Sequence, residues 1–114
     1  MVFRESRCHE VVQFDAEPAT VAKACIEVLK SLGKVSVVSR ETGTIAGKLT
    51  RRPNPLANPV TITIRVSRSG NTTEMSVNTE RKEGLATSGG AQQGLAVFLE
   101  ELGKHPELAG SSGW

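Results

Sequence analysis

Cysteine and histidine are the residues of this 114-residue chain best suited to hold a metal ion or act as nucleophiles, and they are few. If residues 8 to 14 form a strand, the side chains of Cys8 and His9 point to opposite faces of a sheet and cannot easily bind one ion. Cys25 falls in an apolar helical pattern and is expected to be an inert core residue. His105 suits the negative end of a helix dipole. We therefore expect no catalytic residue, no metal site and no bound cofactor.

A glycine-rich stretch at residues 84 to 94, GLATSGGAQQG, leaves three interpretations open. Its backbone N–H groups suit an anion, although the spacing does not match that of a phosphate-binding P-loop. Alternatively, Ser88 caps a helix and the glycines allow a turn and close contact with a sheet. In the third interpretation the stretch is the mobile gate of a ligand cleft.

Charge and aromatic content argue against several nucleic-acid functions. The chain has 14 Lys and Arg residues against 12 Asp and Glu residues, a net charge of +2, which is too weak for DNA binding through the whole surface. The acidic residues are scattered outside apolar runs, so no carboxylate pair for acid–base catalysis is predicted. Single-strand binders stack bases on aromatic rings, which are scarce here: Phe3, Phe14, Phe98 and Trp114.

The length and the apolar pattern predict a single domain over residues 1–114, with a flexible tail from about residue 109. Two cysteines do not make a disulfide framework, and the first twelve residues lack the apolar core of a signal peptide. No stretch approaches the roughly 20 apolar residues of a membrane span. We expect a cytoplasmic protein.

Two segments have the apolar spacing of amphipathic helices. The first follows Pro18, which suits an opening helical turn, and precedes Gly33, which suits the left-handed position past a helix end. Its stripe comprises Val21, Ala24, Cys25, Val28, Leu29 and Leu32. The second helix is predicted to stop near Gly103. Its stripe comprises Leu95, Phe98, Leu99 and Leu102.

Five segments read as strands: residues 8 to 14, 34 to 40, 44 to 50, 60 to 68 and 72 to 81. Alternation predicts which residues point into the core: Val35, Val37, Ile45, Gly47, Leu49, Val60, Ile62, Ile64, Val66, Met75 and Val77. The order is therefore β-α-β-β-β-β-α. We predict an α+β fold, an antiparallel sheet with both helices packed on one face. The other face is predicted to be polar: Lys48, Thr50, Thr61, Thr63, Arg65, Ser67, Ser76, Asn78 and Glu80.

This order, with the segments GTIAGKL, VTITIRV and TTEMSVNTE and a closing helix, resembles small bacterial domains with the TATA-binding-protein-like fold. TATA-binding proteins carry two such repeats and insert phenylalanines into the minor groove. This chain has one unit, and its outward strand positions hold Thr, Ser, Lys and Arg. The resemblance therefore implies a fold and does not imply DNA kinking.

The segment TRRPNPLANPV, residues 50 to 60, joins two strands that must reverse direction. Three prolines deny backbone donors and two asparagines suit turns, yet the segment is longer than a hairpin needs. We expect a structural turn that projects as a semi-rigid tip at residues 51–59. The candidate contact residues on this tip and on the polar face are Lys48, Arg51, Arg52, Asn54, Leu56 and Arg65.

The sequence therefore predicts a non-enzymatic binding or assembly module that contacts a protein partner or a second copy of itself. Two alternatives stay open. A small-ligand or lipid carrier would bind in a cleft between the helices and the sheet, where Leu95, Phe98 and Met75 would have to leave space. A nucleic-acid binder would use Arg51, Arg52, Arg65 and Arg68.

Overall fold

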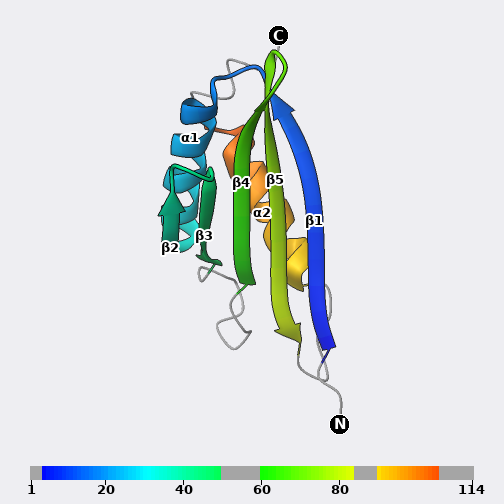
Figure 1. Ribbon diagram of the computed structural model, residues 1–114. Helices are drawn as coiled ribbons and strands as arrows, with labels where there is room; N and C mark the ends of the chain where they lie inside the picture. Colours follow the sequence, from blue (N-terminus) through cyan, green and yellow to red (C-terminus); the bar gives the residue numbers. More distant parts are fainter. Residues whose placement is uncertain (1–3, 50–59, 84–89, 106–114) are drawn as a thin grey trace.

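A computed structural model of the protein describes residues 4–49, 60–83 and 90–105 (Figure 1). Five strands and two helices follow one another in the predicted order: β1 (Arg4–Phe14), α1 (Pro18–Leu32), β2 (Gly33–Ser39), β3 (Thr44–Leu49), β4 (Val60–Ser69), β5 (Thr72–Glu83) and α2 (Gly90–Gly103). The strands form one sheet in the order β1-β5-β4-β3-β2, and every neighbouring pair is antiparallel. The predicted α+β layout is confirmed.

Both helices pack on the same face of the sheet, α1 against β2, β3 and β4 and α2 against β4, β5 and β1 (Figure 1). Between the two layers lies the core, and its members match the predicted helix stripes and inward strand positions. The buried apolar residues are Val21, Ala24, Cys25, Val28, Leu29, Ile45, Leu49, Val60, Ile62, Ile64, Val66, Met75, Val77, Leu95, Phe98 and Leu102. Neither described helix is long and apolar enough to cross a membrane.

Two turns and one helix–sheet contact depend on glycine. Gly70, with φ +61°, is the first residue of the two-residue turn between β4 and β5, the position where such turns favour glycine. Gly43, with φ +67°, closes the turn between β2 and β3, and its carbonyl accepts a hydrogen bond from the Val66 N–H at 2.8 Å. At Gly94 a β-carbon would lie 3.1 Å from Val60, so this glycine lets α2 approach the sheet closely. The predicted close-contact role is confirmed at this position, while residues 84–89 of the glycine-rich stretch lie outside the described residues.

The structure corrects three sequence-based expectations. β1 begins at Arg4 rather than Cys8, because its pairing with β5 continues as far as the pair Arg4 and Glu83. Gly33 does not take the left-handed conformation; its φ is 177°, which is extended backbone. The reason is that α1 passes into β2 without a loop, so Gly33 already pairs with Leu49 on β3.

The third correction concerns the alternation along β2. Val35 pairs with Gly47 and Val37 pairs with Ala46, so the register shifts between them by a β-bulge. Val35 therefore keeps its position on the helix side, whereas Val37 points to the opposite face with half of its surface exposed. The expectation that Val37 enters the core is wrong.

Candidate protein-contact surface

The sheet face opposite the helices, which we call the outer face, carries the predicted contact residues that the structure describes. Lys48 on β3 and Arg65 on β4 both point away from the helices and are exposed. Thr61, Asn78 and Glu80 are also exposed on this face, as the alternation predicted. The remaining predicted contact residues lie outside the described residues: Arg51, Arg52, Asn54 and Leu56.

Basic side chains gather on the β2 to β4 part of the outer face. Cross-strand register places Lys34 of β2 directly opposite Lys48 of β3, and both side chains are exposed. Neither lysine, nor Arg65, forms an ion pair with another described residue. Two like charges directly opposite one another destabilise a strand pair. The free protein therefore bears an electrostatic cost at this pair.

Charge and polarity are unevenly distributed over the outer face. Acidic side chains lie on β5, at Glu74 and Glu80. Apolar side chains lie at the two edges, where Val37 of β2 is 50% exposed and Val11 of β1 is 46% exposed. The prediction of a polar face is thus correct for its centre and wrong for its edges.

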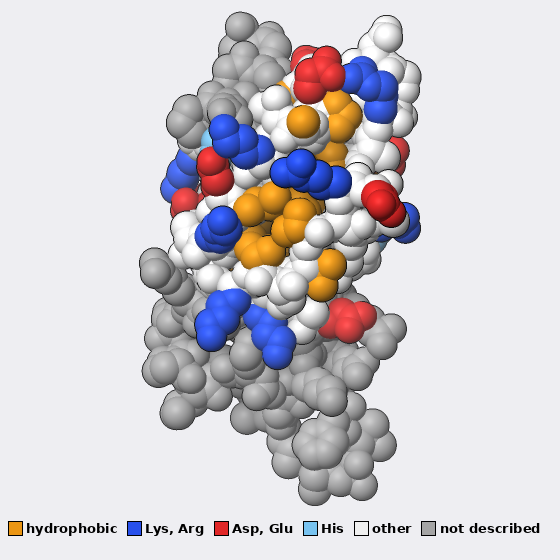
Figure 2. Space-filling view, turned by 60° about the vertical axis from the view of Figure 1, so that its left-hand side comes forward, with side chains coloured by type: hydrophobic (Ala, Val, Ile, Leu, Met, Phe, Trp, Pro, Cys, Tyr) orange, Lys and Arg blue, Asp and Glu red, His pale blue; other side chains and the backbone are white. Residues whose placement is uncertain are grey.

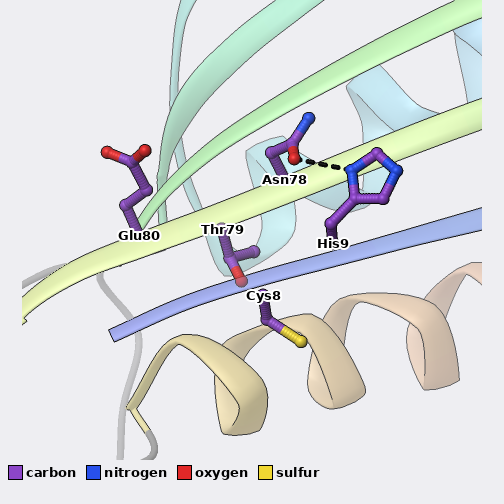
Figure 3. Close-up of a pocket in the computed structure, with 5 residues that line it drawn as sticks. All are labelled: Cys8, His9, Asn78, Thr79 and Glu80. Carbon is purple, nitrogen blue, oxygen red and sulfur yellow. Dashed lines mark hydrogen bonds between the residues drawn. The ribbon is translucent and has the colours of Figure 1, made fainter. Parts of the chain in front are cut away.

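A shallow hollow of about 310 Å³ lies across β1 and β5, lined by Cys8, His9, Asn78, Thr79 and Glu80 (Figure 3). His9 Nδ1 lies 2.7 Å from Asn78 Oδ1; since a carbonyl oxygen only accepts, His9 Nδ1 is the donor. The Cys8 side chain points toward α2, on the other side of β1 from His9. The prediction that these two neighbours do not converge is confirmed. Within the described residues, no group of three or more His, Cys, Asp or Glu residues is placed to hold a metal ion.

The second cysteine lies in the core. Cys25 is fully buried, and burial raises the pKa of its thiol to about 12. Its Sγ donates a weak hydrogen bond to Met75 Sδ at 3.4 Å. A thiol with this pKa has almost no thiolate at neutral pH, so Cys25 is the inert core residue that its helical spacing predicted.

The four arginines of the nucleic-acid alternative do not share one described surface. Arg65 and Arg68 lie on opposite faces of β4, because three positions separate them on a strand. Arg68 forms an ion pair with Glu17, which directly precedes α1. Of the four arginines in the nucleic-acid alternative, Arg65 lies on the outer face, and Arg51 and Arg52 lie outside the described residues.

The three side chains on which a ligand cleft depends are all buried between the helices and the sheet. Leu95 and Phe98 of α2 are 3% and 0% exposed, and Met75 of β5 is 0% exposed. They belong to one continuous core cluster. These three side chains therefore fill the layer between α2 and the sheet at their own positions.

The structure also places on the outer face two residues that the sequence did not assign to it. Lys34 becomes notable only through its opposition to Lys48, which depends on the register of β2 and β3. Val37 reaches the outer face only because of the bulge. Ser36, between Val35 and Val37, is the residue at which the register shifts. A serine between two valines is too weak a signal to predict a bulge from the sequence.

No protein-family model matches the chain, and no curated protein sequence matches it. Similar solved structures do exist. The crystal structure of Ara h 8.0201 is 12% identical with a TM-score of 0.66, over 88% of this chain and 97% of that one. Protein Mll3558 from Rhizobium loti is 14% identical with a TM-score of 0.49, over 90% and 97% of the two chains. Protein CV1439 from Chromobacterium violaceum is 15% identical with a TM-score of 0.46, over 86% and 93%.

The likeness to Ara h 8.0201 shows that this chain shares that protein's fold along most of its length. At 12% identity the likeness extends to the fold alone. The resemblance to bacterial domains with the TATA-binding-protein-like fold stays a prediction.

Proposed function

We propose that this protein is a non-enzymatic binding module whose outer face takes the acidic surface of a partner protein. One observation carries the proposal: Lys34 and Lys48 oppose each other on a sheet face that neither helix covers, and neither lysine forms an ion pair with a described residue. An acidic group placed between them would convert a repulsive pair into two attractive ones. Arg65, on the neighbouring strand β4, extends the basic area.

A protein surface suits this face better than a nucleic acid does. Around the basic residues the described outer face presents hydroxyl and small side chains, such as Thr61, Thr63 and Ser76, and no aromatic ring. Single-stranded nucleic acids gain much of their binding energy by stacking on such rings. Hydroxyl and charged side chains instead match the polar, solvent-accessible rim of a protein interface.

The test uses a fluorescent peptide of alternating Glu and Val, of about eight residues, and a matched peptide with Lys in place of Glu. Fluorescence anisotropy at low salt measures binding, and ¹⁵N NMR maps the contact. We expect the acidic peptide alone to bind and to shift the amides of β2 and β3. Lys48→Glu should weaken binding about tenfold, and Arg65→Glu should weaken it less because Arg65 lies farther from the lysine pair. The control is Lys104→Glu, which makes the same charge change near the end of α2, where Lys104 pairs with Glu100 and Glu101.

Three results would overturn the proposal: equal binding of the acidic and basic peptides, unchanged affinity in Lys48→Glu, or amide shifts confined to other surfaces. Binding of mixed DNA or RNA oligonucleotides at the same face, with no binding of the acidic peptide, would replace it with the nucleic-acid alternative. A nucleic-acid complex would also weaken steeply as salt is added.

A further inference from the structure

The edge strand β2 has a side that no other described strand covers. β2 is last in the sheet order and pairs only with β3. An edge strand presents a row of backbone N–H and C=O groups to which another extended chain can bind. Water satisfies these groups in the free protein, so the side chains around them decide whether the edge is protected or available.

The two edges of the sheet differ in this respect. On β1, the helix-side position that pairs with Val77 is Glu10, an exposed charge pointing toward the helix layer. An inward-pointing charge is a common device that prevents edge pairing. On β2, the corresponding helix-side position is Val38, which pairs with Ile45 and is 48% exposed. Beside it, Val37 is 50% exposed on the outer face, so the β2 edge is apolar on both faces.

The apolar surface of this edge continues onto α1. Val35 of β2 and Ile26 of α1 are half-buried and pack against the core. Glu27 contacts His105 just beyond α2, so the side of α1 that carries Ile26 faces away from α2 and toward the β2 edge. Figure 2 shows this side of the molecule, with apolar side chains gathered in the middle and Lys and Arg side chains around them.

The charges around the β2 edge have one predominant sign. Lys34 at the start of β2 and Arg40 just after its end are exposed and form no ion pair with another described residue. Glu41, in the turn after β2, supplies an opposing charge next to Arg40. A strand with acidic residues near both of its ends therefore complements the edge.

The same charges disfavour a second copy of this chain as the occupant. Two copies of β2 paired antiparallel would bring the Lys34 end of one beside the Arg40 end of the other. Like charges at both ends oppose such pairing. The bulge between Val35 and Val37 further breaks the regular edge at the Lys34 end. A partner segment of opposite charge avoids the repulsion.

We infer that the free edge of β2 binds an extended segment of a partner protein, in which apolar and acidic residues alternate, as an additional antiparallel strand. Alternation places the apolar side chains of the segment on one face, where they cover Val38 on the helix side. Its acidic side chains then point to the outer face, on which Lys34 lies. This inference rests on the proposed function, because Lys34 and Lys48 contribute to both, and it specifies the partner's conformation and the element that binds it.

The closing experiment separates strand pairing from charge attraction. The probes are the Glu–Val peptide and the same peptide N-methylated at alternate backbone nitrogens, which keeps its charge and side chains and removes half of its N–H donors. We expect N-methylation on the edge-facing nitrogens to weaken binding at least about tenfold and methylation of the other set to have little effect, since donors alternate along a strand. Amide hydrogen exchange of Val37–Ser39 should slow when the unmodified peptide binds.

A substitution in the protein supplies the second arm. Val38→Lys adds a positive charge, which attracts the acidic peptide, but places an ammonium at the helix side of the edge, a device that opposes strand pairing. We expect it to weaken binding although it makes the protein more basic. Val11→Lys, on the outer face of the opposite edge, is the matched control and should leave binding unchanged or slightly tighter. Val38 and Val11 are both about half exposed, so both variants are expected to fold.

Each outcome bears on one of the two proposals. Equal binding of both N-methylated forms, or tighter binding to Val38→Lys, would overturn strand pairing; if Lys48→Glu still weakens binding, the outer-face function stands without it. If the acidic peptide fails to bind the unmodified protein, the proposed function and the inference both fail.

Discussion

A β-carbon at position 47 would lie 2.1 Å from the carbonyl oxygen of Lys34 and 3.0 Å from Cδ2 of Leu29. The first atom belongs to the backbone of β2 at its bulge, and the second to the buried side of α1. Gly47 is therefore the residue that lets the bulge of β2 approach β3 while α1 packs beneath it.

Gly47→Ala is accordingly expected to destabilise the protein by about 1–3 kcal/mol, because the Lys34 carbonyl cannot move aside without shifting β2. Chemical denaturation with circular dichroism measures the change. The control is Gly103→Ala, since a β-carbon there meets no atom within 4 Å, and it should be neutral or stabilising by a few tenths of a kcal/mol. Equal stability of the two variants would show that the bulge is not tightly packed.

At the scale of elements, a polar contact joins α1 to His105, which follows the end of α2. His105 Nε2 lies 2.5 Å from Glu27 Oε2. The hydrogen bond from His105 is the main cause that lowers the pKa of Glu27; nearby His105, Lys23 and Lys30 charges act in the same direction, and desolvation opposes them. A carboxyl group whose pKa is lower in the folded state stabilises the fold above its unfolded pKa, and this stabilisation is lost as pH falls.

We therefore expect Glu27→Ala to lower the melting temperature at neutral pH. The difference from the parent protein should disappear as the pH falls from the ordinary glutamate range, about 4.5, through the lowered pKa of Glu27. Thermal unfolding followed by circular dichroism across pH 2–7 is the measurement. Glu100→Ala, which removes an exposed pair with Lys104, should show a smaller difference at neutral pH. A Glu27→Ala deficit that persists unchanged at the acid end would contradict the assignment.

Most elements could be predicted from the sequence because helical and strand periods differ clearly. The stripe from Val21 to Leu29 and the alternation from Val60 to Val66 each have one period throughout, and both ended in the core. The irregularities could not be predicted, because a bulge and a helix that enters a strand without a loop have no composition signal of their own. Lys48 and Arg65 were placed correctly by alternation, whereas Lys34 required the register of two strands.

On the scale of the whole molecule, two helices cover one face of five strands, and no described helix or strand covers the other face or the two edges. Each edge then needs its own protection against pairing with another molecule. The β1 edge has Glu10 on its helix side. The β2 edge has exposed valines and relies on Lys34 and Arg40 beyond them.

Removing these two charges together should expose the apolar edge to self-association. We expect the Lys34→Ser/Arg40→Ser double variant to form dimers or larger species as its concentration rises, because the repulsion between antiparallel copies of β2 is lost. Size-exclusion chromatography with light scattering measures the mass. Arg65→Ser/Lys104→Ser removes the same net charge away from this edge and should behave as the parent protein does. Association of both variants to the same extent would point to net charge rather than to the edge.

The direct passage of α1 into β2 at Gly33 also determines where the protein tolerates engineering. One residue inserted at this junction would move every following β2 side chain to the opposite face, exchanging Lys34 with Val35. The turn at Gly70 and Asn71 points into open space, since a β-carbon at Gly70 would have no atom within 4 Å, although Gly70 itself must stay glycine because its φ is +61°. A fluorophore or affinity tag therefore belongs in that turn. The junction at Gly33, by contrast, cannot be lengthened by a single residue.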